Sequence, residues 1–204
     1  MDESFRYFIE NTEVHNVNDA NIDFMVDAEL VQSAKVEVTL GAGESILGNT
    51  ELKIFHVLND TETLEGTFIV TTPRANIHKA YTDVSIDCYS TLWLLAKHKC
   101  EQRYTCKKGT QVTNEIMRII NSLKLKYTLE IEMSEKSISN DMDFEIGTPW
   151  LTVFNELLKV INYSRVFPTR EGNYKSVPYI PPSDRAITIT YDEEDPANII
   201  LPYL

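Results

Sequence analysis

Cysteine thiols are the first side chains in this 204-residue chain that could bind a metal or react. The three cysteines, Cys88, Cys100 and Cys106, lack the paired spacing of a zinc site and are too few for a disulfide framework. His98 could join Cys100 and Cys106 as a third ligand, but a structural zinc site needs a fourth. We therefore expect buried thiols and no metal site.

The histidines offer no better starting point for catalysis. His15, His56, His78 and His98 stand in unlike contexts, and each is expected to be an ordinary strand or loop residue. The sequence contains no G-x-S-x-G, H-E-x-x-H, P-loop or G-x-G-x-x-G pattern, so the common devices that activate nucleophiles, metal-bound water or phosphates are absent. We expect a protein that is not an enzyme, with no catalytic residue and no cofactor.

Two groups of carboxylates need a separate interpretation. Asp141, Asp143 and Glu145 have strand spacing and could place an acid/base pair on one face, but a solvated edge beside buried Phe144 and Ile146 is the simpler reading. The acidic run 192–195 could offer oxygens to a hard cation, yet it lacks the alternating ligands and turn glycine of a calcium loop. We expect a charged, mobile loop there.

Charge is unevenly distributed along the chain, which has a formal net charge of −12. Residues 1–60 carry three Lys/Arg against twelve Asp/Glu, whereas residues 97–126 carry eight Lys/Arg against two Glu. Proteins that grip nucleic acid are normally basic, because affinity comes from releasing counterions, so stable DNA or RNA binding is disfavoured. Although Trp93, Tyr104 and Tyr127 lie near it, the basic stretch is expected to face an acidic neighbouring subunit or solvent.

No membrane or export signal is visible. The longest apolar run, 91–96, is far shorter than a membrane span, and the sequence begins without the basic and apolar regions of a signal peptide. We expect the chain to be made and folded in a cytoplasm.

The first half reads as short strands and the second as helices mixed with strands. Period-two alternation, as in 35–40, and turn residues between runs predict an antiparallel barrel or sandwich. The expected strands are 6–9, 22–26, 35–40, 52–58, 67–72 and 83–88. From residue 89 the period changes, which indicates an α+β fold with a barrel over 1–88 and a smaller α+β domain over 89–204.

Three helices are expected in the second part. Ser90 should cap a short one, and apolar residues share one face of a second over 110–123. The third should begin with Thr148 as N-cap and Pro149 in the first turn and end at Asn162. Its buried face should consist of Leu151, Phe154, Leu157, Leu158 and Ile161. Strands are expected at 127–132 and, with a clear alternation, at 186–191.

Short motifs follow one another along the chain at Ile54–Leu58, Gly66–Val70 and Thr72-Pro73, then at Phe144–Thr148 and Glu171–Tyr174. This ordered series resembles the amino-terminal part of phage tail baseplate hub and tail-associated lysin (tail endopeptidase-like) proteins. Pro149-Trp150 departs from the small polar residues usual after the Gly-Thr pair.

The resemblance implies a structural subunit of a tail tip or baseplate hub in a virion or prophage tail, assembled in the bacterial host cytoplasm. It implies a homotrimeric ring that continues the tail tube, lets DNA pass without specific binding, and contacts tail-tube, distal-tail and fibre or lysin proteins. Family members usually run on into a second barrel, so the chain is expected to be a fragment or to obtain that barrel from partners. The alternatives are a fragment of a peptidoglycan-degrading tail enzyme and a carbohydrate- or receptor-binding module.

The acidic balance fits a channel independently of the resemblance, because a negative wall repels phosphates instead of holding them. Asp19, Asp23, Asp27 and Glu29 are the carboxylates expected to line it.

Overall fold

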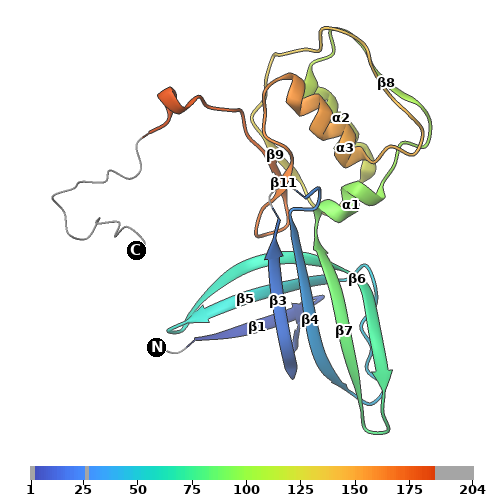
Figure 1. Ribbon diagram of the computed structural model, residues 1–204, viewed down its shortest axis with the longest axis vertical. Helices are drawn as coiled ribbons and strands as arrows, with labels where there is room; N and C mark the ends of the chain where they lie inside the picture. The colour runs from blue at the N-terminus through green and yellow to red at the C-terminus, as the bar shows by residue number, and fades with distance from the viewer. Residues whose placement is uncertain (1–2, 26–27, 187–204) are drawn as a thin grey trace, which may run out of the picture.

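A curled antiparallel sheet forms the first part of the computed structural model, which describes residues 3–25 and 28–186 (Figure 1). Its seven strands lie in the order β2-β1-β5-β6-β7-β4-β3. The strands are β1 (Glu3–Ile9), β2 (Thr12–Val14), β3 (Val17–Phe24), β4 (Gln32–Gly41), β5 (Glu51–Leu58), β6 (Thr61–Ile77) and β7 (Tyr81–Ser90).

The sheet curls because its two edge strands are neighbours in sequence. β2 and β3 lie at opposite ends of the strand order, yet only His15 and Asn16 separate them. Asn16 has a φ of 60°, in the left-handed region that asparagine tolerates better than most residues. The two edges therefore meet at this corner and diverge beyond it, which leaves an open barrel.

Alternation decides which side of each strand faces the inside of the curl. On β4, Ala34, Val36 and Val38 are buried, whereas Lys35 and Glu37 between them are not. The β5–β6 hairpin closes through Asn59 and Asp60, both with positive φ, as a turn matching the twist of paired strands requires.

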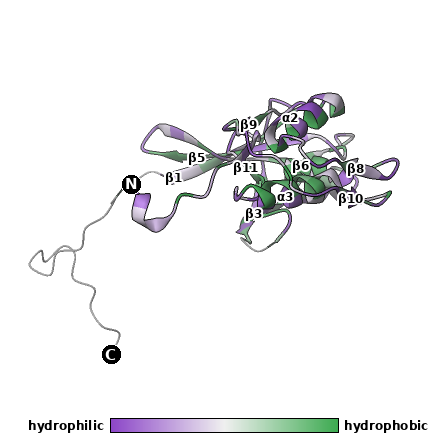
Figure 2. Ribbon diagram, turned by 90° about the horizontal axis from the view of Figure 1, so that it is seen from above, coloured by the Kyte–Doolittle hydropathy of each residue, from purple (hydrophilic) through white to green (hydrophobic). Residues whose placement is uncertain are grey.

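The second part packs two longer helices over short strand pairs (Figures 1 and 2). β8 pairs with β10, and β12 lies between β11 and β9. The elements are α1 (Leu92–Lys97), β8 (Tyr104–Cys106), α2 (Val112–Leu123), β9 (Leu129–Ile131), β10 (Met142–Phe144), α3 (Trp150–Val160), β11 (Phe167–Pro168), β12 (Tyr174–Ser176) and the 3-10 helix η1 (Pro182–Asp184). No helix among the described residues is long and apolar enough to cross a bilayer.

Two clusters of buried residues form the cores, and β6 contributes to both. Phe68 and Val70 point into the curl, whereas Ile69 between them packs into the core beneath α2 and α3. All five residues expected on the buried face of α3 are at most 2% exposed. The α+β class and the antiparallel β-rich first part are therefore confirmed.

Several expected details were wrong for identifiable reasons. Ser90 does not cap α1, because its hydroxyl donates to the Leu30 carbonyl, and Thr91 takes the cap position. The Thr148 hydroxyl is likewise engaged, on the Glu145 carbonyl, and the N-cap of α3 is Pro149. Ile146 is 68% exposed, not buried.

Strand lengths also differ from expectation. β2 was not expected, and β6 runs on through Pro73 to Ile77. Proline is tolerated there because β5 pairs with β6 only as far as Ile69, which leaves the later part free on one side. The strand expected at 186–191 lies outside the described residues except for Ala186.

Candidate functional site

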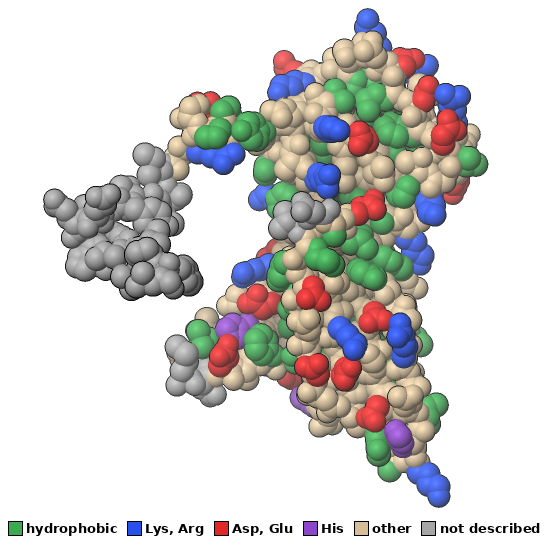
Figure 3. Space-filling view, viewed as in Figure 1, with side chains coloured by type: hydrophobic (Ala, Val, Ile, Leu, Met, Phe, Trp, Pro, Cys, Tyr) green, Lys and Arg blue, Asp and Glu red, His purple; other side chains and the backbone are tan. Residues whose placement is uncertain are grey.

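The outer face of the curled sheet is polar and mainly acidic. Strand register puts the outward side chains of β3, β4, β7 and the second half of β6 in adjacent rows. The charged members are five acids, Asp19, Asp23, Glu37, Asp83 and Asp87, and two bases, Lys35 and Arg74. Figure 3 shows the acidic and basic side chains interspersed over the lower half of the molecule, where these strands lie.

Each of the two bases on this face pairs with a nearby carboxylate, and the face carries more carboxylates than bases. Lys35 lies 3.1 Å from Glu37, and Arg74 lies 3.3 Å from Asp87. Such exposed pairs contribute little to stability, but they cancel charge locally. Asp19 and Asp23 have no Lys or Arg partner within the described chain, so this edge of the face keeps a negative potential.

The four carboxylates expected to line a channel do not lie together. Asp19 and Asp23 share the outer side of β3. Glu29 follows in the β3–β4 turn and accepts a hydrogen bond from the Thr152 hydroxyl of α3 at 3.1 Å, so it lies against the second part. Asp27 falls outside the described residues.

A buried polar junction joins the two parts of the molecule. The Thr67 hydroxyl donates to the Arg170 carbonyl and the Thr91 hydroxyl to the Gly172 carbonyl, each at 2.7 Å. Gly172 has a φ of +90°, and an added Cβ would lie 2.8 Å from the Tyr127 ring and 2.9 Å from Thr91. The Gly-Thr-Phe and Glu-Gly-Asn motifs, about a hundred residues apart, thus meet at one contact.

Glu51 reinforces this junction from the start of β5. Its carboxylate is 2.6 Å from the Lys126 ammonium and 3.2 Å from that of Lys53, and it accepts a short hydrogen bond from the Tyr127 hydroxyl. Burial acts to raise the pKa of Glu51, but these hydrogen bonds outweigh it and lower the pKa below its usual value. Sequence reasoning missed Glu51, because two of its partners, Lys126 and Tyr127, lie 75 and 76 residues away.

The Phe144–Thr148 motif braces the start of α3. The Gly147 N–H donates to the Cys100 carbonyl at 2.8 Å, and the Cys100 N–H donates to the Thr148 carbonyl at 2.9 Å. Gly147 has a φ of +84°, which only glycine adopts readily. This motif therefore positions backbone, not a reactive group.

The acid/base candidates pair with two cations of the basic stretch 97–126. Asp141 contacts the Lys107 ammonium at 2.9 Å, and Asp143 contacts the Arg103 guanidinium at 3.0 Å. The pKa of Asp141 is lowered by the Lys108 N–H and by Lys107, so it is not tuned to take up a proton near neutral pH.

The remaining candidates for chemistry are also accounted for. All three cysteines are at most 2% exposed, and burial raises the pKa of the Cys88 thiol to about 12, which disfavours a reactive thiolate. No group of three His, Cys, Asp or Glu residues among those described could hold a metal ion. The run 192–195 lies outside the described residues.

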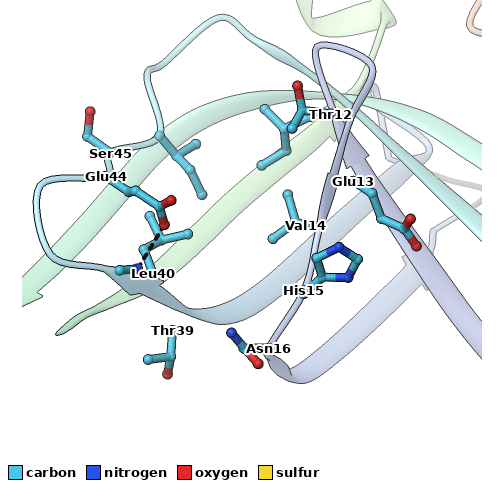
Figure 4. Close-up of a pocket in the computed structure, with 12 residues that line it drawn as sticks. Thr12, Glu13, Val14, His15, Asn16, Thr39, Leu40, Glu44 and Ser45 are labelled. Carbon is cyan, nitrogen blue, oxygen red and sulfur yellow. Dashed lines mark hydrogen bonds between the residues drawn. The ribbon is translucent and has the colours of Figure 1, made fainter.

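A cavity occupies the corner where β2 passes into β3 (Figure 4). It has a volume of about 500 Å³, and His15, Asn16, Leu40 and Glu44 lie around it. No Phe, Tyr or Trp lines it, so this cavity lacks the stacking platform on which a sugar ring could rest.

Comparison with solved structures identifies the fold. A 43 kDa tail protein of prophage MuSo2 from Shewanella oneidensis matches with a TM-score of 0.67 at 10% identity, over 87% of this chain and 56% of that one. A tail protein from Neisseria meningitidis MC58 matches with a TM-score of 0.62 at 13% identity, over 86% and 50%. The chain has a phage tail protein fold.

A chain of the half-lidded Francisella PdpA-VgrG complex shares this tail protein fold, with a TM-score of 0.58 at 12% identity over 90% of this chain and 32% of that one. The chain spans about half the length of the two tail proteins. No protein-family model and no curated protein sequence matches it.

Proposed function

We propose that the chain is a structural subunit of a phage-type tail tip or baseplate hub. Three copies of it, the number that the motif resemblance implies, surround a channel that continues the tail tube. The outer face of β3, β4, β7 and β6 forms the wall of this channel. The proposal rests on the tail protein fold, and the polar, acidic character of that face is the observation that orients the subunit.

The wall of a channel through which DNA passes must be hydrated and must not bind the DNA phosphates tightly. The outer face meets both conditions, because short polar and acidic side chains dominate it and both bases are paired. Asp19 and Asp23 add unpaired negative charge, which repels the DNA backbone. A face so charged is unsuited to the core of a protein–protein interface, where charged residues are depleted.

The contacts that the motif residues make also agree with a structural role. Thr67, Gly172 and Gly147 fix backbone contacts between elements, and Asp141 and Asp143 form surface ion pairs. We propose that the protein is not an enzyme, that it resides in the tail of the particle, and that its partners are other tail proteins.

Electron microscopy of the purified assembly tests the proposal, with its mass measured in solution. We expect a closed ring whose channel is lined by β3 and β4. A monomer at every concentration, or a neighbour seated on the outer face of these strands, would contradict it.

Charge reversal offers a functional check. Asp19→Lys combined with Asp23→Lys should make the ring retain DNA at low salt. The matched control, Glu135→Lys with Glu156→Lys, changes the charge by the same amount at two exposed positions of the second part and should not make the ring retain DNA. Equal retention by both variants would argue against the assigned wall.

A further inference from the structure

In the described open barrel, one side of the edge strand β3 has no strand paired to it. In the described structure β3 pairs with β4 alone, and β1 pairs with β2 only from Tyr7 to Ile9, so the free sides of β3 and of residues 3–6 face an open slot. Tyr7, Val17 and Ala20 line a cavity of about 350 Å³ there. An edge of this length is a template for another strand.

Apolar side chains at the slot are left uncovered. Phe24 is 61% exposed at one end of β3, and Phe5 of β1 is 50% exposed. Ala20, Ile22 and Phe24 share the inward side of β3, whereas Asp19, Asn21 and Asp23 share the outward side. A fitting strand would be apolar on its inward side and uncharged and polar on its outward side, next to the aspartates.

Residues 186–191 have this pattern. Ile187, Ile189 and Tyr191 alternate with Thr188 and Thr190, and the segment contains no charge. β-branched residues dominate it, as is typical of strands. The acidic run 192–195 follows immediately and bounds the segment.

The described arm that leads to this segment leaves its own body. The Tyr179 N–H still donates to the Asn162 carbonyl of the body at 2.9 Å. Beyond it, Ile180 is 50% exposed, and Pro181 has the extended dihedrals of a polyproline helix. Arg185 lies over the Tyr179 ring at 5.6 Å and donates to the Ile180 carbonyl at 2.9 Å. The arm is thereby stiffened, and Figures 1 and 2 both show it projecting from the molecule.

We infer that residues 186–191 of one copy add to the free edge of β3 in a neighbouring copy as an eighth strand. The inference rests on the proposed assembly for the presence of that neighbour. We take the strand to be antiparallel, as every pair in this sheet is. Opposing Thr188 to Asn21 puts the isoleucines inward and carries Asp192 past Asp19, whereas a shift of two residues would set these two acids opposite each other.

Disulfide trapping in the full-length chain tests this arrangement. Asn21→Cys and Thr188→Cys, made as separate variants and mixed under mild oxidation, should give a covalent dimer that contains one of each. Asn21→Cys mixed with Ile189→Cys should not, because position 189 faces the other side of the strand. The native cysteines, at most 2% exposed, should not compete. Closure of the double variant Asn21→Cys/Thr188→Cys within one molecule would overturn the exchange.

A proline scan gives a second measurement. Ile189→Pro removes an N–H that the strand needs and should abolish the oligomer while leaving the circular dichroism of the chain unchanged. Asn198→Pro, beyond the segment, should leave the oligomer intact. A ring that forms without the disulfide and survives Ile189→Pro overturns the inference but not the proposed function, whereas a parent chain that never forms an oligomer overturns the proposed function itself.

Discussion

At the scale of single residues, Gly172 lies where the two parts of the molecule meet. Its positive φ and its contacts with Tyr127, Thr91 and Thr67 leave no room for a side chain. Gly109 has a similar φ of +83° but open space around it. Substitutions at Gly172 and at Gly109 can therefore be compared to separate the cost of backbone strain from the cost of steric overlap.

We expect Gly172→Ala to destabilise the protein by several kcal/mol, because left-handed strain of about 1–2 kcal/mol adds to overpacking of about 1–3 kcal/mol. Gly109→Ala should cost only the strain. Urea unfolding of both variants measures the difference, and equal losses would contradict the close contact at Gly172.

The Glu51 carboxylate predicts a dependence of stability on pH. Its pKa is lower in the folded than in the unfolded chain, so the stabilisation is complete above the unfolded pKa and is lost as pH falls through the folded pKa. Glu51→Gln should cost about 1–3 kcal/mol at pH 7, because the buried site loses a charge-assisted hydrogen bond.

Unfolding measured between pH 7 and pH 3 tests this. The difference between the parent and Glu51→Gln should shrink at the acid end. Glu37→Gln, on the exposed outer face, is the control and should change stability little at any pH. A difference that stays constant with pH would remove Glu51 from this role.

At the scale of elements, the apolar stripe of α3 was the most predictable feature. Leu157 is fully buried, and Leu157→Ala should lower the free energy of unfolding by about 2–5 kcal/mol. Glu156→Ala, at the exposed position that precedes Leu157, should change the free energy of unfolding by less than about 0.5 kcal/mol. Equal stability of the two variants would contradict the assigned face.

Element boundaries were less predictable, because tertiary contacts decide them. Ser90 and Thr148 are good capping residues, but their hydroxyls bind other carbonyls. β3 begins at Val17 and includes Asn18 and Asp19, two residue types that are depleted in strands. They are tolerated here because β3 is an edge strand with one solvated face. None of these partners is visible in local sequence.

At the scale of the whole molecule, the order of the motifs predicted the tail protein fold, but single motifs did not disclose their roles. The contact between Thr67 and Arg170 spans 103 residues, and the ion pairs of Asp141 and Asp143 span 34 and 40. Two cations of the basic stretch thus pair with acids that looked separate from it in sequence. The boundary near residue 88 stays a prediction.

The absence of a metal requirement is a further prediction for the whole chain. EDTA should leave its melting temperature unchanged, because a structural ion that bound only the folded state would raise it. Calorimetry with and without EDTA measures this, and a large drop would point to His98, Cys100 and Cys106 or to the run 192–195.

The position of Ile69 has a consequence for how the molecule comes apart. Adjacent side chains of β6 enter two different cores, so this strand cannot leave one core without leaving the other. Unfolding of either part should therefore unfold the other as well, and calorimetry should record one cooperative transition instead of two. Ile69→Ala, which weakens the link on one side only, should split that transition or broaden it.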